Sequence, residues 1–233
     1  MPRDQDRRQK ALERKATKRK EHLRTMVRSE GSVAPASVRA LVRAAAQWPL
    51  YETWMTRDWK NEENLVQAVV ARRSPTGQLA AAVFLIDLGC LGVKNALVRP
   101  FASRAEYDAL LETLGEEMPL EKADLDLVAK VIDEGITYAK QLGFRPHRDY
   151  YEAAAFLAGA EPEACHVKIP LGREGKPFFF AGPYDNVKRI MAQLTRRLGP
   201  NGFHYVVPVG PEFQVIPAES DSEEAGDEDD DEG

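Results

Sequence analysis

The pattern of apolar and polar residues predicts a β-hairpin in the first half of the chain. Two apolar runs, 65–73 and 79–88, are separated by the turn 74–77, whose sequence is Ser-Pro-Thr-Gly. Proline and glycine in so short a link favour a tight turn, so the two runs should pair as antiparallel neighbours. The second run is apolar at successive positions from Ala80 to Ile86, which predicts a strand buried on both faces near the centre of a sheet.

Apolar residues at helical spacing and capping residues predict five helices. Ser103 and Glu106 fit a capping box, so a helix should begin after Ser103. Gly143 stands where a glycine commonly ends a helix. The predicted helices cover 38–45, 104–114, 125–142, 148–158 and 187–198. The last of them is amphipathic, and its polar face should carry Lys188, Arg196 and Arg197.

A second hairpin is predicted closer to the C-terminus. Residues 166–171 and 176–181 are separated by the glycine-bounded turn 172–175, and 203–209 should form a last strand. Because hairpins and helices follow one another in blocks rather than as strict β-α-β units, the expected fold class is α+β. The sequence therefore predicts a single domain at 31–216, with antiparallel hairpins packed by amphipathic helices and flanked by disordered or helical termini.

Charge divides the chain into a nearly neutral domain and two strongly charged ends. The whole chain has a net charge of −5. Within the basic N-terminal arm, 1–30, residues 1–28 hold eleven Lys/Arg and four Asp/Glu, whereas residues 219–233 of the acidic tail, 217–233, hold ten Asp/Glu and no base. The arm has no sustained apolar stripe, so we expect it to be disordered or a frayed helix that orders on a partner. Repulsion between like charges should keep the tail disordered.

Composition excludes several classes of protein. No apolar run approaches the roughly 20 residues of a membrane helix, and the arm lacks the apolar middle of a signal peptide. Two cysteines, Cys90 and Cys165, are too few for a disulfide framework, and no C-x-x-C pair supports a zinc ribbon or a redox site. We therefore expect a cytoplasmic protein with no metal, no cofactor and no membrane contact.

The basic arm predicts binding to nucleic acid. Cations that neutralise phosphates release counterions, which gives sequence-independent, salt-sensitive affinity, and Arg/Lys-rich segments commonly fold on RNA. The leading interpretation is a non-catalytic protein that binds RNA or a ribonucleoprotein; the plain alternative is an arm that only improves solubility. We also hypothesise that the tail folds back on the arm and competes with phosphate. The predicted phosphate-binding residues are Arg7, Arg8, Lys10, Arg14, Lys15, Lys18, Arg19, Lys20 and Arg24.

A cysteine-dependent hydrolase or transferase is the alternative function. Cys90 lies in a glycine-flanked segment at the end of an apolar strand, close in sequence to Lys94. A thiolate beside a lysine has a lowered pKa and can act as a nucleophile. The enzyme interpretation requires Cys90 to be accessible and within reach of an imidazole; otherwise Cys90 is a small buried apolar residue. The candidates for base and orienting acid are His147 or His204 and Asp87 or Asp149.

Two other segments have a functional and a plain interpretation. Residues 181–186 form a strand, glycine and helix start that could present backbone N–H groups to an anion, but a plain turn with an Asp cap explains them more simply. All three tryptophans fall in 48–59, where they form either a surface for a protein partner or a core that closes a helix onto the sheet.

Five short segments resemble those of a known family. They are FLID at 84–87, CLGVK at 90–94, GFRPH at 143–147, AGPYD at 181–185 and LTRRLG at 194–199. They are similar to segments of a bacterial family of uncharacterised cytoplasmic proteins, some of which carry a cysteine-rich SEC-C-type metal motif. The similarity spans about 40–209 and leaves out the arm and the tail. Because this chain lacks the cysteine motif, the resemblance implies a bacterial, cytoplasmic, single-domain protein and no zinc, and it implies no activity.

Overall fold

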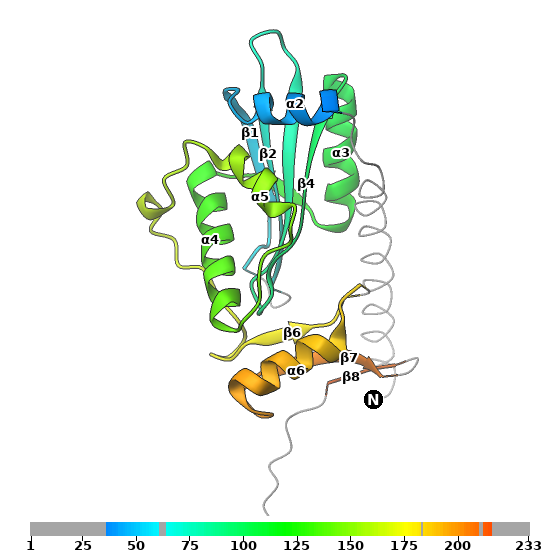
Figure 1. Cartoon of the computed structure of the whole chain (residues 1–233), viewed down its shortest axis with the longest axis vertical. Coiled ribbons are helices and arrows are strands. Elements are labelled where there is room, and N and C mark those ends of the chain that lie inside the picture. The colour runs from blue at the N-terminus through cyan, green and yellow to red at the C-terminus, as the bar shows by residue number, and fades with distance from the viewer. Residues whose placement is uncertain (1–35, 61–63, 183, 210–211, 216–233) are drawn as a thin grey trace, which may run out of the picture.

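Five strands form one antiparallel sheet at the centre of the molecule (Figure 1). The computed structural model describes residues 36–60, 64–182, 184–209 and 212–215. Strands β2 and β3 pair over their whole lengths, so the first predicted hairpin is confirmed. Every residue of β3 is buried between β2 and β4, as its apolar pattern predicts. The strand order is β4-β3-β2-β1-β5, with bounds Leu50–Thr56 (β1), Leu65–Arg73 (β2), Leu79–Asp87 (β3), Gly92–Phe101 (β4) and Leu120–Lys122 (β5).

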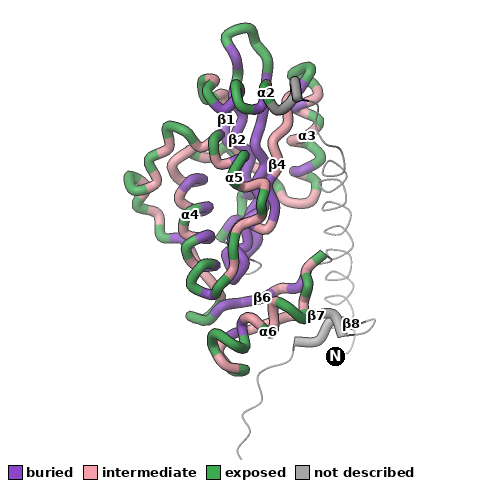
Figure 2. Tube along the Cα trace, viewed as in Figure 1, coloured by how far each residue is buried: buried purple, intermediate pink, exposed green. Residues whose placement is uncertain are grey.

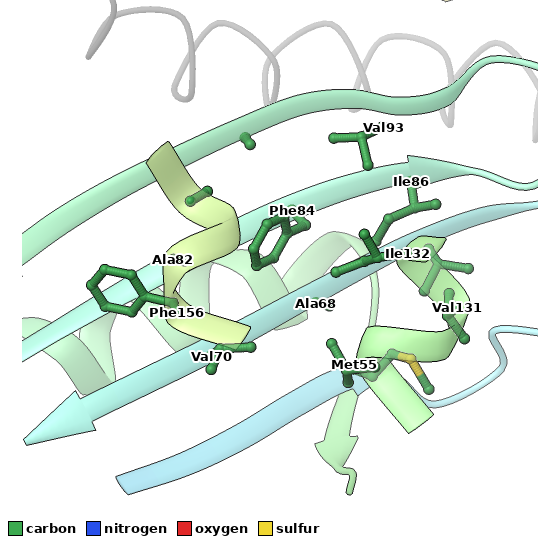
Figure 3. Packing of buried hydrophobic residues seen from close by; sticks show 14 of the residues in the cluster. Met55, Ala68, Val70, Ala82, Phe84, Ile86, Val93, Val131, Ile132 and Phe156 are labelled. Carbon is green, nitrogen blue, oxygen red and sulfur yellow. The ribbon is translucent and has the colours of Figure 1, made fainter. Parts of the chain in front are cut away.

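Helices cover both faces of this sheet. The even-numbered residues of β2 pack on one side and the odd-numbered residues on the other, because successive strand residues point to opposite faces. The first face makes the larger core, where Phe84, Ile132 and Phe156 gather (Figure 3). The elements on it are α2 (Ala36–Ala45), α4 (Leu125–Gln141), α5 (Tyr150–Ala153) and η1 (Ala154–Leu157). Helix α3 (Arg104–Glu117) packs on the second face, and the result is the α+β fold that the sequence predicts.

The helix ends agree closely with their sequence signals. The Ser103 hydroxyl accepts a hydrogen bond from the Glu106 N–H at 3.2 Å, so α3 begins where the capping pattern predicts. The Glu106 carboxylate accepts from the Ala102 N–H at 2.9 Å, one residue earlier than in a standard capping box. Gly143 follows α4 at φ +86°, in the left-handed region that glycine adopts most easily. The helix predicted over 148–158 is present as the short α5 followed by the 3-10 turn η1.

A second, smaller sheet lies at the end of the first, below it in Figure 1. It contains β6 (Phe178–Phe180), β7 (His204–Val209) and β8 (Glu212–Val215) in that order. Strands β6 and β7 are parallel and are joined by α6 (Val187–Leu198), whereas β7 and β8 are antiparallel. The last predicted strand and the helix over 187–198 are thus confirmed.

The predicted hairpin between 166–171 and 176–181 is wrong. The turn forms, as an isolated bridge between Arg173 and Lys176, and the predicted strand 176–181 contains β6, but 166–171 is not a strand and β6 pairs with β7 instead. The backbone of this region instead bonds to the end of β3: Gly172 N–H donates to Leu88 O and Phe178 N–H donates to Gly89 O, both at 2.9 Å. Proline at 170 also removes one donor that a strand pairing would use.

Three strands of the large sheet were missed from sequence. Strand β1 lies within the tryptophan cluster, where Trp59 is buried in the main core and Trp54 packs on the opposite face, in agreement with the interpretation of these rings as core. Strand β4 is an edge strand that contains Pro100, and β5 has only three residues. Within the described residues, no helix is both long and apolar enough to cross a membrane.

A buried arginine ties the sheet to the segments around it. Arg72 on β2 is 6% exposed, and its guanidinium donates hydrogen bonds only to backbone carbonyls among the partners that the structure describes. The acceptors are Trp48 O at 2.8 Å, Phe156 O at 2.9 and 3.0 Å, and Ala158 O. Burial lowers the pKa of Arg72 from its ordinary value, because a charged group loses hydration there.

Candidate nucleic-acid interface

Helix α6 carries only cations among its charged residues. The helix begins where the Asn186 side chain accepts a hydrogen bond from the Arg189 N–H at 3.1 Å, and it ends before Gly199. Its inner face buries Leu194 completely and packs Ile190 and Met191 against the same cluster. The opposite face is exposed to solvent (Figure 2). We call the four exposed cations of this helix the α6 basic surface: Lys188, Arg189, Arg196 and Arg197.

Ion pairing explains none of these four cations, and helix stability explains only two of them. Among the ion pairs between described residues, none involves any of them. Lys188 and Arg189 lie in the first turn, where the helix dipole is positive, and there a cation costs about 0.3–1 kcal/mol rather than contributing. Only Arg196 and Arg197 stand at the favourable C-terminal end. The position of Lys188 and Arg189 is therefore electrostatically unfavourable until an anion is present.

The packing of α6 holds this surface against the end of α4. Gln193 donates to the backbone carbonyl of Leu142 at 2.9 Å, and Arg197 Nε donates to that of Gln141 at 3.0 Å. Gly143 lies so close to the Gln193 amide that a Cβ atom there would come within 2.1 Å of Gln193 Nε2. Arg196 also hydrogen-bonds to the Gln193 side chain. The cations at the C-terminal end of α6 are thus fixed in position by a short chain of contacts.

The packing of α6 against the end of α4 brings together two segments that contain no acidic residue. Residues 186–211 and residues 135–148 have no Asp or Glu, although the whole chain contains 37 of them. The second segment adds Lys140 and Arg145, both exposed, on either side of the residues that α6 packs against. Three of the acidic residues that border these segments are already paired: Glu134 with Lys130, Asp149 with Arg148 and Asp185 with Lys94. The result is an exposed positive surface on a nearly neutral domain.

The residues predicted to bind phosphate from the basic arm lie outside the described residues. They are Arg7, Arg8, Lys10, Arg14, Lys15, Lys18, Arg19, Lys20 and Arg24. The acidic tail lies outside the described residues as well. The boundaries proposed for both segments therefore stay predictions.

The structure places Cys90 in the core rather than at the surface. Its side chain is 0% exposed and packs with Phe179, Leu194 and Phe203 in the cluster that joins the small sheet to the rest of the fold. Burial, and to a lesser extent the charge of Asp87, raise the pKa of the thiol well above its ordinary value. The accessible thiolate that the hydrolase or transferase interpretation requires is absent from this arrangement, and Cys90 acts here as a small apolar residue.

Asp87 has the local structural role that its position at the end of β3 allows. Its Oδ1 accepts hydrogen bonds from the N–H groups of Cys90 at 2.8 Å and Leu91 at 3.3 Å, which fixes the turn into β4. Burial raises the pKa of the carboxyl, and the charge of Lys94 and the two backbone hydrogen bonds oppose that shift. Lys94 itself donates to Asp185 Oδ2 at 2.6 Å.

The histidines are placed by local contacts. His147 donates its backbone N–H to Val93 O at 2.9 Å, and its Nδ1 lies 3.7 Å from the Asp149 carboxylate, so this predicted pair does form. Asp149 N–H also points to His147 Nδ1 at 3.4 Å. His204 lies on β7, with Nε2 3.8 Å from Glu174. At 3.7 Å the contact between Nδ1 and the carboxylate is longer than a hydrogen bond, and the buried thiol offers the imidazole no exposed nucleophile to activate.

The loop before α6 differs in detail from its prediction. The helix is capped by Asn186, whereas Asp185 turns back to accept the Gly182 N–H at 2.7 Å and to bind Lys94. The Asp185 carboxylate thus accepts the backbone N–H that this loop could otherwise offer to an anion. Across the described part of the chain, no three His, Cys, Asp or Glu side chains gather in a way that could hold a metal ion.

Comparisons of the chain with models of protein families, with curated proteins and with solved structures find no match. The resemblance to the bacterial family therefore stays a prediction, and the functional argument depends on the residues alone.

Sequence reasoning identified three of the four cations on α6 as outward but gave them no role. Arg189 was not named among them, although its spacing places it beside Arg196 on the side of the helix opposite the apolar stripe. The lack of any acid over 186–211 was a signal in the sequence itself. That 135–148 lies against this segment could only be learned from the fold.

Proposed function

We propose that this protein is a non-catalytic binder of RNA, free or within a ribonucleoprotein, that contacts phosphates through the basic arm and through the α6 basic surface. The observation that carries the proposal is the packing of two acid-free segments, which gives the nearly neutral domain one exposed positive surface. The arm alone could be a solubilising extension. A second cationic surface on the folded part supports phosphate binding by both segments over that explanation.

Electrostatics supports phosphate as the ligand. Arg196 and Arg197 have planar guanidinium groups that bind phosphate oxygens through two parallel hydrogen bonds, and Lys188 supplies a compact positive charge. The eight-residue separation of Lys188 and Arg196 spans about 12 Å along the helix axis, which covers more than one phosphate of a nucleic-acid strand. Contacts of this kind position a backbone and read no bases.

The test is the salt dependence of RNA binding. A single-stranded RNA of about 20 nucleotides is titrated at salt concentrations from about 50 to 400 mM, because each phosphate contact adds roughly 0.7 to the slope of log affinity against log salt. Replacing Lys188, Arg189, Arg196 and Arg197 together by Gln should weaken binding and reduce that slope by up to about 3. Deleting residues 1–30 should reduce it further.

A matched variant separates the surface from net charge. Arg43, Arg57, Lys60 and Lys168 are exposed cations elsewhere on the described fold, and replacing these four by Gln removes the same charge. This control should bind RNA nearly as well as the unmodified chain. Equal loss of affinity in both fourfold variants, or a slope that does not change with salt, would reject the proposal.

A further inference from the structure

The small sheet delivers the acidic tail to the neighbourhood of α6. Strand β7 follows α6 directly, and β8 runs back antiparallel to it, so that Val215 lies opposite Val206. The chain therefore leaves β8 near the end of the sheet at which it arrived from the C-terminus of α6. The first residue of the acidic run, Glu219, is four positions after Val215 and can lie at most about 14 Å from it.

The charges of the two segments are complementary. Residues 219–233 hold ten carboxylates and no base, and the four cations of the α6 basic surface form no ion pair with an acidic side chain among the described residues. Fifteen residues of extended chain can span about 50 Å, whereas the twelve residues of α6 are about 18 Å long. Length does not limit the contact, and a tethered segment acts at a local concentration on the order of millimolar.

We infer that the acidic tail, residues 219–233, docks on the α6 basic surface and competes there with RNA phosphate. This inference goes beyond the proposed function in naming an internal competitor, and its consequence for RNA rests on that function. The tail presents closely spaced carboxylates, which accept the same hydrogen bonds from Arg196 and Arg197 as phosphate oxygens do. Docking also relieves the unfavourable position of Lys188 and Arg189 at the start of α6 by bringing negative charge to them.

The competition changes the salt response in a recognisable way. RNA that binds must displace the tail, which then regains its own counterions, so fewer ions are released overall than from the tail-free protein. The intact chain should therefore show weaker RNA binding at low salt and a shallower salt slope. At high salt both contacts are screened, and the two proteins should converge.

The direct test uses the tail as a separate peptide. A labelled peptide of residues 216–233 is titrated into the chain that lacks those residues, first at about 50 mM salt and then at about 500 mM. Binding is expected at low salt, with a loss of about tenfold or more when the four α6 cations are replaced by Gln. The control with Arg43, Arg57, Lys60 and Lys168 replaced should bind the peptide as before, and so should a chain that also lacks residues 1–30.

The arms of this experiment separate the inference from the proposed function. Peptide binding that survives loss of the α6 cations, or that disappears when residues 1–30 are removed, would overturn the inference and assign the tail to the arm. RNA binding that is unaffected by removal of the tail would also overturn it while leaving the proposed function intact. Peptide binding to α6 without any RNA binding would keep the docking and reject the proposed function.

A double-variant cycle excludes a simple effect of net charge. Replacing the ten tail carboxylates by Asn and Gln should raise RNA affinity at low salt by roughly tenfold in the intact chain. In the chain without the α6 cations, the same replacement should change affinity by less than about threefold, because there is no docked tail to release. Equal effects in both backgrounds would show long-range repulsion instead of docking.

Discussion

The buried Arg72 guanidinium makes the sharpest stability prediction. Replacing it by Ala removes the donors that satisfy the carbonyls of Trp48, Phe156 and Ala158, all in the region where α2, η1 and β2 meet. A hydrogen bond to a charged group contributes about 1.5–3 kcal/mol, and part of this is offset because the buried cation is no longer desolvated. We expect Arg72→Ala to lower the free energy of unfolding by about 3–5 kcal/mol.

Two other replacements identify the cause. Arg72→Met keeps most of the side-chain volume but leaves the same carbonyls without donors, so it should be nearly as destabilising as Ala. Arg72→Lys keeps the charge but cannot reach three separate carbonyls from one ammonium group, and we expect a loss of about 2 kcal/mol. Arg73→Ala is the matched control, because Arg73 is exposed and contributes mainly a contact with the Tyr51 ring.

Urea unfolding followed by tryptophan fluorescence measures all four variants. Trp48, whose carbonyl accepts from Arg72, packs on the main core with Trp59, and Trp54 packs on the opposite face of the sheet, so tryptophan emission reports the unfolding of the sheet and its main core. At 233 residues, a loss of 3–5 kcal/mol corresponds to a decrease in Tm of about 6–20 °C. An Arg72→Met protein as stable as the unmodified chain would refute the reasoning, because it would mean that these carbonyls need no donor from the protein.

Three further predictions concern the junction of the two sheets. Burial raises the pKa of Asp87, so the folded state holds the proton of this carboxyl more tightly than the unfolded state does. The resulting stabilisation is full below the ordinary carboxyl pKa of about 4 and is lost as pH rises through the higher pKa of the folded state. In denaturant titrations, the free energy of unfolding of Asp87→Asn relative to that of the unmodified chain should therefore increase over the same pH range. Cys90 should resist a thiol reagent in the folded protein while the half-buried Cys165 reacts, with both reacting in denaturant; rapid modification of two thiols in the native state would contradict the buried position of Cys90. Gly143→Ala should lower the free energy of unfolding by about 1–3 kcal/mol, because φ is +86° and the new Cβ would collide with Gln193. It should also weaken RNA binding, because Gln193 is hydrogen-bonded to Arg196 and would move it. Unchanged stability of this variant would mean that the contact between Gly143 and Gln193 is loose.

The sequence predicted those elements whose signals are local. The β2–β3 hairpin has a Pro/Gly turn between two apolar runs, α3 has a capping serine, and α6 has a strong apolar stripe, so each could be recognised without knowledge of its partners. The edge strand β4 was missed because its extended conformation is stabilised by pairing with β3. Its own residues give a weak strand signal, since they include glycine, lysine, asparagine and proline.

The errors arose where pairing is distant in sequence. Strand β6 was expected to pair with the segment just before it, but its partner is β7, 26 residues further on in register and parallel to it. A parallel partner leaves no turn signal, since the link between the two strands is the whole of α6. The candidate site shows the same limit: the four cations of α6 are visible in the sequence, whereas their union with Lys140 and Arg145 depends on the packing of α6 against the end of α4.

The way in which the small sheet is attached has a consequence for how the protein can diverge. Its first strand and the turn before it are joined to the end of β3 by backbone groups, Phe178 to Gly89 and Gly172 to Leu88. Residues 89 and 172 must remain glycine there, because a Cβ would lie 2.3 Å from the Phe178 oxygen and 2.3 Å from the Lys176 oxygen, respectively. Main-chain attachments persist through most substitutions. The hydrogen bonds that hold α6 to the end of α4 come from Gln193 and Arg197, so the outer positions 188 and 189 can change in evolution without altering them, and related chains could bind a different ligand there.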